Sequence, residues 1–383
     1  MLDSSAPTTV TARAPGRVNL IGEHTDYNGG LCLPVALPDE TTVAATPRDD
    51  DVVRLTSGAV EGAWEGRLSD LGPGRVNGWA AYAAGVLWVL AADGVPVPGC
   101  DLHVESTVPL GAGLSSSAAL EAAVAVAVWG LLDRPLHDDT RALLAEVCRR
   151  AETEVVGAPT GGLDQAAVLR VPAGGAVLLD FAAGASDPVT PVRFDLPAAG
   201  LALTVVDTRV SHTHSDSDEA GYGARRRECE DAARALGVET LSLATPAEVE
   251  ECAALVVAGD DVLRRRARHV VTENARVTAV VAALDAGDWR TVGALLSASH
   301  VSMRDDFEIS CPELDLAVAT ALDAGALGAR MTGGGFGGSA VALVPAERVD
   351  AVRRAVDAAF AREGFGAPGH LDGTPSAPAS LLP

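Results

Sequence analysis

Residues 15–30 of this chain read Pro-Gly-Arg-Val-Asn-Leu-Ile-Gly-Glu-His-Thr-Asp-Tyr-Asn-Gly-Gly. This run restricts the possible folds and kinds of functional site more than any other part of the sequence. An apolar, strand-like piece over 18–21 leads into a turn at Gly22. Within ten positions the run holds four ionisable groups, which are Arg17, Glu23, His24 and Asp26. Such groups are costly to bury at a strand-to-turn junction unless they bind a ligand or one another. A solvated turn with a salt bridge would explain any two of them, but four between glycines favour a site for a polyhydroxylated ligand.

Length and composition predict a folded protein with more than one domain. The chain has 383 residues, and at ~100–200 residues per domain it would form two or three domains. Its hydrophobic content of 48% is ample for buried cores. The net charge of −23 argues against nucleic acid or an anionic membrane surface as a partner. The same charge repels ATP, so a nucleotide site would have to be locally positive.

The absence of lysine excludes several kinds of active site. All 29 basic residues are arginines. A Walker-type phosphate loop, a Schiff base with pyridoxal phosphate and the protein-kinase arrangement each require a lysine. Arginine must therefore supply any side-chain cation that takes part in catalysis.

Cysteine spacing and hydropathy predict a cytoplasmic protein. The six cysteines show no Cys-x-x-Cys spacing and no disulfide pattern of a short domain, so we expect reduced thiols. Residues 1–9 lack the basic and apolar regions of a signal peptide. The longest uncharged apolar stretch, 79–92, has fourteen residues, whereas a membrane helix needs ~18–20.

Strands and helices are mixed without strict alternation, which predicts an α+β fold. We expect strands over 9–14, 31–37, 41–46, 52–56, 101–106, 175–181, 201–207 and in a strand–loop–strand over 329–344. We expect helices over 77–92, 115–132, 139–156, 219–236, 246–257, 261–286, 313–324 and 346–363. The proline-punctuated stretch 187–197 predicts an N-terminal domain over 1–195 and a C-terminal domain over 196–383. The tail 364–383 has no usable periodicity, and we expect it to be flexible.

Two glycine-rich segments have the composition of ligand loops. Residues 109–121, Pro-Leu-Gly-Ala-Gly-Leu-Ser-Ser-Ser-Ala-Ala-Leu-Glu, follow a strand and open a long helix. Glycines let backbone approach a ligand, and the free N–H groups of a first helical turn attract anions. An ordinary serine N-cap would need one serine, whereas three can bind phosphate or ligate Mg²⁺. The second segment, 331–339, is a glycine loop between apolar strands or, alternatively, a long flexible hairpin.

Two carboxylates are candidate site residues whose roles the spacing leaves open. Glu152 lies at the margin of the apolar stripe of its helix, where it could face a site or pair with Arg149 at the surface. Asp164, flanked by glycines, is a candidate general base or the N-cap of a short helix. The motif His212-Thr-His-Ser-Asp-Ser-Asp218 is similar to a metallo-hydrolase signature, but it lacks the last histidine and we expect a polar loop.

Together these motifs resemble the galactokinase family of small-molecule kinases over about residues 9–363. Residues 16–27 match its sugar signature, and 109–119 and 332–338 match the superfamily's phosphate loop and C-terminal glycine loop. The resemblance implies a two-domain α+β fold with the active site between the domains. It also implies Mg²⁺- and ATP-dependent phosphorylation of the anomeric hydroxyl of galactose, the entry step of galactose metabolism.

The resemblance also implies roles for individual residues. Arg17 and Asp164 would form the catalytic pair. The sugar would be held by Glu23, His24, Thr25, Asp26, the backbone of Gly161, and Tyr222. ATP would lie on Gly111, Ala112, Gly113, Leu114, Ser115, Ser116 and Ser117. Magnesium would lie at Ser117 and Glu152.

Two departures from the family pattern leave the detailed sugar preference open. Gly162 and Leu163 replace bulkier apolar residues, so we expect a looser pocket that could admit an N-acetyl group. The loop before Tyr222 is unusually rich in His and Asp. Alternatives are a kinase for N-acetylgalactosamine or arabinose, and a galactose- and ATP-binding transcriptional sensor. Such sensors lose residues at the Ser-Ala step of the phosphate loop, whereas Ser117-Ala118 is intact here. We expect a monomer whose partners are the sugar and ATP.

Overall fold

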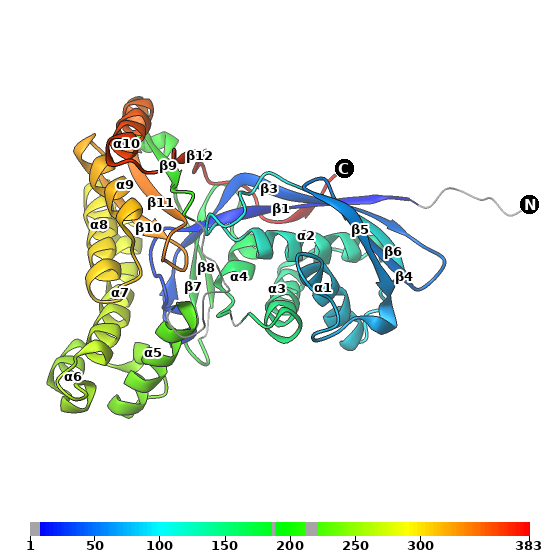
Figure 1. Ribbon diagram of the computed structural model, residues 1–383, viewed down its shortest axis with the longest axis horizontal. Helices are drawn as coiled ribbons and strands as arrows, with labels where there is room; N and C mark the ends of the chain where they lie inside the picture. Colours follow the sequence, from blue (N-terminus) through cyan, green and yellow to red (C-terminus); the bar gives the residue numbers. More distant parts are fainter. Residues whose placement is uncertain (1–7, 159, 186–187, 211–220) are drawn as a thin grey trace, which may run out of the picture.

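Two β-sheets, each with helices packed against it, organise the chain (Figure 1). This computed structural model describes residues 8–158, 160–185, 188–210 and 221–383. Its strands are β1 (Val10–Asn19), β2 (Leu31–Cys32), β3 (Pro34–Pro47), β4 (Val52–Ser57), β5 (Val60–Arg67), β6 (Cys100–Ser106), β7 (Ala176–Asp180), β8 (Val189–Val192), β9 (Leu201–Asp207), β10 (Gly328–Thr332), β11 (Ser339–Pro345), β12 (Gly369–Asp372) and β13 (Ser380–Leu381). Its α-helices are α1 (Ala80–Ala92), α2 (Ser116–Leu131), α3 (Asp138–Arg150), α4 (Leu163–Arg170), α5 (Tyr222–Leu236), α6 (Pro246–Glu251), α7 (Val262–Asp285), α8 (Trp289–Asp305), α9 (Pro312–Asp323) and α10 (Val349–Glu363).

The larger sheet has nine strands and is mixed. Its main path runs β13-β1-β3-β6-β4-β5, and β7 attaches β2 and β8 beside β3. The β4–β6 pair is parallel. A bulge between Pro15 and Arg17 keeps β1 continuous up to the glycine-flanked turn. The two strands predicted over 31–37 and 41–46 belong mostly to one strand, β3. Pro38 does not interrupt this strand, because it is exposed at a point where no hydrogen bond of the sheet requires a backbone N–H.

Helices α1 to α4 form a layer on one face of the larger sheet (Figure 1). Helix α2 packs on β1 and β3 and confirms the helix predicted over 115–132, and its nearly all-apolar sequence is buried on almost every side. The phosphate-loop sequence therefore precedes a helix anchored at the centre of the first domain.

No helix within the described ranges is both long and apolar enough to cross a membrane.

The smaller sheet has four antiparallel strands in the order β10-β11-β9-β12. Helices α8 and α9 pack on β10, α7 packs on α8, and α10 packs on α9. Helix α8 was not predicted from the sequence. Gly293 lies in its middle, and a β-carbon there would come within 2.3 Å of the Leu327 carbonyl oxygen. The glycine lets the helix approach the start of β10, and it weakens the local helix signal for the same reason.

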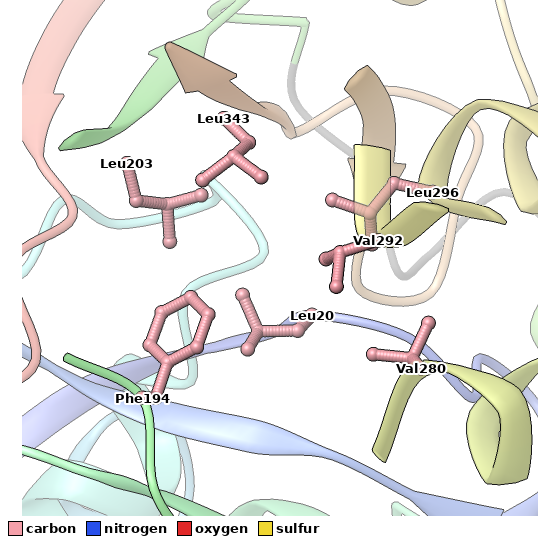
Figure 2. Close-up of a pocket in the computed structure, with 7 residues that line it drawn as sticks. All are labelled: Leu20, Phe194, Leu203, Val280, Val292, Leu296 and Leu343. Carbon is pink, nitrogen blue, oxygen red and sulfur yellow. The ribbon is translucent and has the colours of Figure 1, made fainter. Parts of the chain in front are cut away.

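An apolar core joins the two sheets. Side chains that follow β1 pack against β9, β11, α7 and α8 in one buried cluster. Figure 2 shows a small cavity in this cluster, lined by Leu20, Phe194, Leu203, Val280, Val292, Leu296 and Leu343. Its lining is entirely apolar, so it offers a polyhydroxylated ligand no hydrogen-bond partner. The fold is the α+β, two-domain arrangement that the sequence predicts.

The tail contains two short strands, so the expectation of a flexible tail is wrong for these residues. Strand β12 pairs with β9, while β13 pairs with β1 in the first sheet. Short strands of this kind are formed by pairing with an existing sheet edge, and the local sequence carries little signal for them. Because β13 returns to the first sheet, the predicted division between residues 195 and 196 stays a prediction.

Residues 373–382, here called the C-terminal strap, also hold the helix that carries Asp164. The Ala379 N–H donates to the Val168 carbonyl at 2.9 Å. Arg141 Nη1 donates to the carbonyls of Leu169 and Ala379, at 2.9 and 2.8 Å. One arginine therefore clamps the strap to the end of α4.

We expect Arg141→Ala to lower the free energy of unfolding by about 1–3 kcal/mol, because two partly buried carbonyls lose their donor. Urea denaturation monitored by circular dichroism measures this change. Arg193→Ala is the control, since Arg193 is largely exposed and makes only a long ion pair with Asp195. Equal stability of the two variants would contradict a clamping role for Arg141.

Candidate active site

The turn after β1 brings together the ionisable groups of the opening sequence. Gly22 has a φ of +97°, and a β-carbon there would lie 2.3 Å from the Leu31 carbonyl oxygen, so only glycine fits. Thr25 is fully buried, and its hydroxyl lies 2.8 Å from the Gly22 carbonyl and 2.7 Å from that of Leu31. The hydroxyl of Thr25 thus holds the turn, and the structure leaves it no exposed surface for a sugar.

Arg17 and Asp164 form an ion pair across 147 positions of sequence. Arg17 Nη2 and Nε lie 2.6 and 2.8 Å from Asp164 Oδ1. Arg17 Nη1 also donates to the Gly113 carbonyl at 2.7 Å. The N-cap position of α4 is Gly162, so the alternative role of Asp164 as an N-cap is wrong. The pair lies beside the phosphate loop, as the resemblance implies.

Asp26 faces Gly161 at very close range. A β-carbon on Gly161 would lie 2.0 Å from Asp26 Oδ2, so this approach requires glycine. Burial, followed by smaller effects of the Asp164 and Glu23 carboxylates, raises the pKa of Asp26 to about 7. Such a carboxylate gains from a ligand that donates hydrogen bonds to it.

Gly162 does not enlarge the space beside Asp26. Its φ is +98°, and a β-carbon there would point toward Arg149 Cδ at 3.1 Å and Phe181 at 3.9 Å. Gly162 supplies the left-handed conformation that begins α4. The direction of this β-carbon therefore does not support the expectation that Gly162 loosens a pocket for an N-acetyl group.

Glu23 ties the sugar-signature turn to the second glycine loop. Its Oε1 accepts from the Gly333 N–H at 2.8 Å, and its Oε2 accepts from Asn19 Nδ2 at 2.7 Å. Burial raises the pKa of Glu23, while nearby Arg330 and Arg17 oppose this effect. The carboxylate therefore has protein partners on both oxygens, and its contact with a sugar stays a prediction.

His24 also joins the two segments. Its Nε2 lies 3.2 Å from the Gly334 carbonyl, which can only accept, so Nε2 carries the proton and Nδ1 accepts from the Tyr27 hydroxyl at 2.8 Å. Burial and nearby His269 lower the pKa of His24 to about 3, which keeps the ring neutral. The ring of Tyr222, at the start of α5, lies 5.1 Å from that of His24. Tyr222 thus reaches the same cluster, as predicted.

The segment from Gly111 to Ser117 forms an open cradle at the start of α2. Gly111, Gly113 and Ser115 all have positive φ, of 76°, 71° and 59°. The hydroxyl of Ser115 is buried and has no hydrogen-bond partner among the described residues. A β-carbon on Gly333 would lie 2.9 Å from the Gly113 carbonyl oxygen, so the two glycine loops touch. Free N–H groups, an unpartnered hydroxyl and Arg17 suit a phosphate chain.

Glu152 lies on a π-helical turn over 151–156 that continues α3, where a single α-helix was predicted. Such turns re-aim side chains and are frequent at functional sites. Arg149 pairs with Glu146 at 2.6 Å, so the predicted alternative of a surface pair between Glu152 and Arg149 is wrong. The turn directs Glu152 toward α2 and α4.

Glu152 and Ser117 come together, as the resemblance implies. The Ser117 hydroxyl lies near enough to Glu152 to oppose the rise in its pKa, and Gln165 Nε2 lies 2.5 Å from Glu152 Oε2. Burial and the charge of Asp164 raise the pKa of Glu152 to about 7. A carboxylate and a hydroxyl beside the phosphate cradle are hard oxygen ligands that suit Mg²⁺.

Several residues that shape the site were not predicted. Arg330 is fully buried near Glu23, and Glu273 accepts from the Gly22 N–H at 3.0 Å. Glu273 lies near no motif, so the sequence held no signal for it, whereas Arg330 directly precedes the glycine-rich segment 331–339. Gln165 directly follows Asp164, and a search of the neighbours of the predicted base could have found it. The histidine- and aspartate-rich motif at 212–218 lies outside the described residues.

We expect Asp26→Asn to stabilise the ligand-free protein increasingly as pH rises. Between pH 4 and 7 the folded protein keeps a proton on Asp26 that the unfolded chain, with a carboxyl pKa near 3.8, has released. The unfolded state then binds fewer protons, so this group lowers stability as pH rises through that window. Asparagine exchanges no proton. Because Asp26 is only half-buried, we expect a relative gain on the order of 1 kcal/mol between pH 5 and pH 8.

Urea denaturation of both proteins at pH 5 and pH 8, without ligands, measures this difference. Asp195→Asn is the control, since the Asp195 side chain is 45% exposed, and it should show no pH-dependent gain. A stability difference between wild type and Asp26→Asn that is the same at both pH values would contradict the raised pKa.

Comparisons with known proteins agree with this geometry. Three family models match the chain: the galactokinase galactose-binding signature at residues 3–47, the GHMP kinases N terminal domain at 81–170 and the GHMP kinases C terminal at 280–362. The chain is 52% identical to a galactokinase of Streptomyces coelicolor over 96% of its own length and 93% of the relative's. It is 43% identical to a galactokinase of Bos taurus, over 87% of this chain and 83% of that protein.

Solved structures show the same similarity. The crystal structure of Lactococcus lactis galactokinase complexed with galactose matches with a TM-score of 0.90 and 31% identity, covering 99% of this chain and 97% of that chain. A mevalonate kinase from L. major matches with a TM-score of 0.65 at 19% identity and covers 98% of each chain. At that identity the second match concerns the fold alone.

Proposed function

The chain belongs to the galactokinase family of GHMP kinases, and we propose that it transfers the γ-phosphoryl group of ATP to the anomeric hydroxyl of galactose. The products would be galactose 1-phosphate and ADP. The observation that carries the proposal is the Arg17–Asp164 pair, which lies between the phosphate cradle and the turn of the sugar signature. A sugar hydroxyl and a phosphate chain can meet there without any lysine.

The mechanism assigns one step to each member of the pair. Asp164 accepts the proton of the anomeric hydroxyl as its oxygen attacks the γ-phosphorus and the bond to the ADP oxygen breaks. Arg17 holds Asp164 through two nitrogen atoms and stabilises the negative charge on the transferring group. Asp26 and the Tyr222 hydroxyl orient the sugar from the opposite segment, and the backbone of Gly161 lets Asp26 approach.

The residues present fit ATP and Mg²⁺. The cradle over 111–117 would hold the phosphates, and Ser117 with Glu152 would hold the cation. When bound, Mg²⁺ neutralises phosphate charge and ATP supplies the phosphoryl group. The unpartnered Ser115 hydroxyl and the raised pKa of Glu152 both indicate polar groups that gain a partner on binding.

We expect Glu152→Ala to raise the Mg²⁺ concentration needed for half-maximal activity by about tenfold or more and to lower kcat, because one of few protein ligands is lost. Steady-state assays over a Mg²⁺ series at saturating ATP and galactose measure both effects. Glu146→Ala is the matched control, since Glu146 pairs with Arg149 at the surface. A change in thermal stability alone would contradict a role of Glu152 at the metal.

A coupled ADP-release assay with a panel of monosaccharides tests the proposed function. ADP release that depends on galactose, ATP and Mg²⁺ is the expected result. Binding of galactose and ATP without ADP release would favour the sensor, and faster turnover of N-acetylgalactosamine or arabinose would favour another sugar kinase. The intact Ser117-Ala118 step, with Ser117 near Glu152, supports the enzyme.

The small-molecule partners follow from the site, while location and assembly are further parts of the proposal. We propose a cytoplasmic monomer that has no nucleic-acid or membrane partner, on the basis of the net charge of −23 and of six cysteines, all within the described residues, that form no disulfide. Light scattering of the purified protein measures its mass against the 38.9 kDa of one chain.

A further inference from the structure

One buried carboxyl group near the site has no part in the mechanism above. Glu121 is the only charged residue of α2, and its side chain is 0% exposed. Burying a carboxyl group in an otherwise apolar helix costs stability, and an apolar side chain of similar volume would avoid that cost. The contacts of the Glu121 carboxyl group should therefore offset this cost and contribute to the site.

Glu121 is connected to Glu152 through one side chain. Gln165 is also 0% exposed, and its Nε2 donates to Glu121 Oε2 at 3.2 Å and to Glu152 Oε2 at 2.5 Å. The Ser117 hydroxyl lies near Glu152 and lowers its pKa. Ser117 and Glu121 are four residues apart on α2 and so share one face of it. The four side chains, here called the circuit, lie between α2, α4 and the π-helical turn, and Gln165 links Glu121 to Glu152.

The circuit limits how Gln165 and Glu152 can be oriented. A primary amide that donates both N–H groups of Nε2 to two carboxyl groups is held in that orientation by both of them. Gln165 thereby occupies one oxygen of Glu152, which leaves the second oxygen and the Ser117 hydroxyl for a cation. Burial, followed by the charge of Glu152, also raises the pKa of Glu121 well above its usual range.

We propose that Glu121 and Gln165 are positioning residues for the metal-binding pair, with Glu121 acting on Glu152 only through Gln165. This inference rests on the proposed function in so far as Ser117 and Glu152 hold the cation. Residues that orient metal ligands typically change metal affinity by about 10–100-fold when removed.

The test measures metal binding without turnover. Mn²⁺, a paramagnetic substitute for Mg²⁺, is titrated with ADP into the full-length protein, and its affinity is read by electron paramagnetic resonance. We expect Glu121→Met and Gln165→Met each to weaken Mn²⁺ binding by about tenfold. Glu121→Gln, which keeps an acceptor for Gln165 Nε2, should stay within about threefold of wild type. Glu105→Met, at an exposed position of β6, is the control.

A double variant separates this proposal from a general loss of structure. If Glu121 acts through Gln165, Glu121→Met should add nothing to the effect of Gln165→Met. Unfolding in urea should show that Glu121→Met is at least as stable as wild type. Additive losses, unchanged Mn²⁺ affinity in Glu121→Met, or equal losses in Glu121→Gln and Glu121→Met would each overturn the proposal. Because Mn²⁺ affinity is measured without turnover, it can be interpreted even if the galactokinase assay shows no activity.

Discussion

Asp164→Asn should lower kcat by about 10²–10⁴-fold while galactose binding survives, because general-base catalysis is worth that much. Asparagine keeps an oxygen that can accept from Arg17, so the pair that joins α4 to β1 should persist. It cannot accept the proton of the attacking hydroxyl. ADP release in a coupled assay measures kcat, and calorimetry measures galactose binding.

The control for Asp164→Asn is the same substitution at Asp195, which is exposed and far along the chain from any site residue. It should leave kcat unchanged. If Asp164→Asn keeps more than about a tenth of wild-type kcat, this would contradict the assignment of Asp164 as the general base. A variant that loses galactose binding together with kcat would indicate that Asp164 mainly holds the sugar.

The sequence predicted those parts of the site that lie within one short segment. The run from Arg17 to Asp26 and the loop from Gly111 to Ser117 carry their chemistry in consecutive residues, so composition and spacing are enough to mark them. The pairing of Arg17 with Asp164 joins β1 to α4, and no local pattern encodes that contact. It was predicted only because the motifs resemble those of a known family.

Contacts formed by the fold as a whole could not be predicted. The spacing left Glu152 undecided, because a regular α-helix was assumed where the structure has a π-helical turn. Arg330 and Glu273 come from β10 and α7, and the core between the sheets places them against Glu23 and Gly22. The strands of the tail likewise depend on edges supplied by β9 and β1.

The same distinction applies to the two glycines before Asp164. Gly162 was expected to loosen the pocket and Gly161 to hold the sugar through its backbone, but the two glycines face different side chains. Gly161 faces Asp26, whereas Gly162 faces Arg149. The direction of a missing β-carbon depends on the backbone, which the sequence alone does not give.

We expect a preference for galactose over glucose of roughly 10²-fold or more in kcat/KM. The two sugars differ in the orientation of the 4-hydroxyl, which by family resemblance lies on the side of Asp26 and Tyr222. A hydrogen bond to a charged acceptor is worth about 1.5–3 kcal/mol, and glucose would leave the partly buried Asp26 carboxylate without this bond. Asp26→Ala should therefore reduce the ratio toward unity, mainly by loss of activity on galactose.

A second variant tests the same carboxylate without removing it. Gly161→Ala would place a β-carbon 2.0 Å from Asp26 Oδ2, so the carboxylate must move and the galactose preference should fall as it does in Asp26→Ala. Gly162→Ala is the matched control, because its β-carbon points toward Arg149; it should strain the backbone and lower stability but leave the sugar ratio intact. Rates are compared for galactose, glucose and N-acetylgalactosamine. Comparable kcat/KM of the wild-type protein on galactose and glucose would refute the role of Asp26. A preference for the N-acetyl sugar would show that the pocket is wide enough for an N-acetyl group, although Gly162 faces away from Asp26.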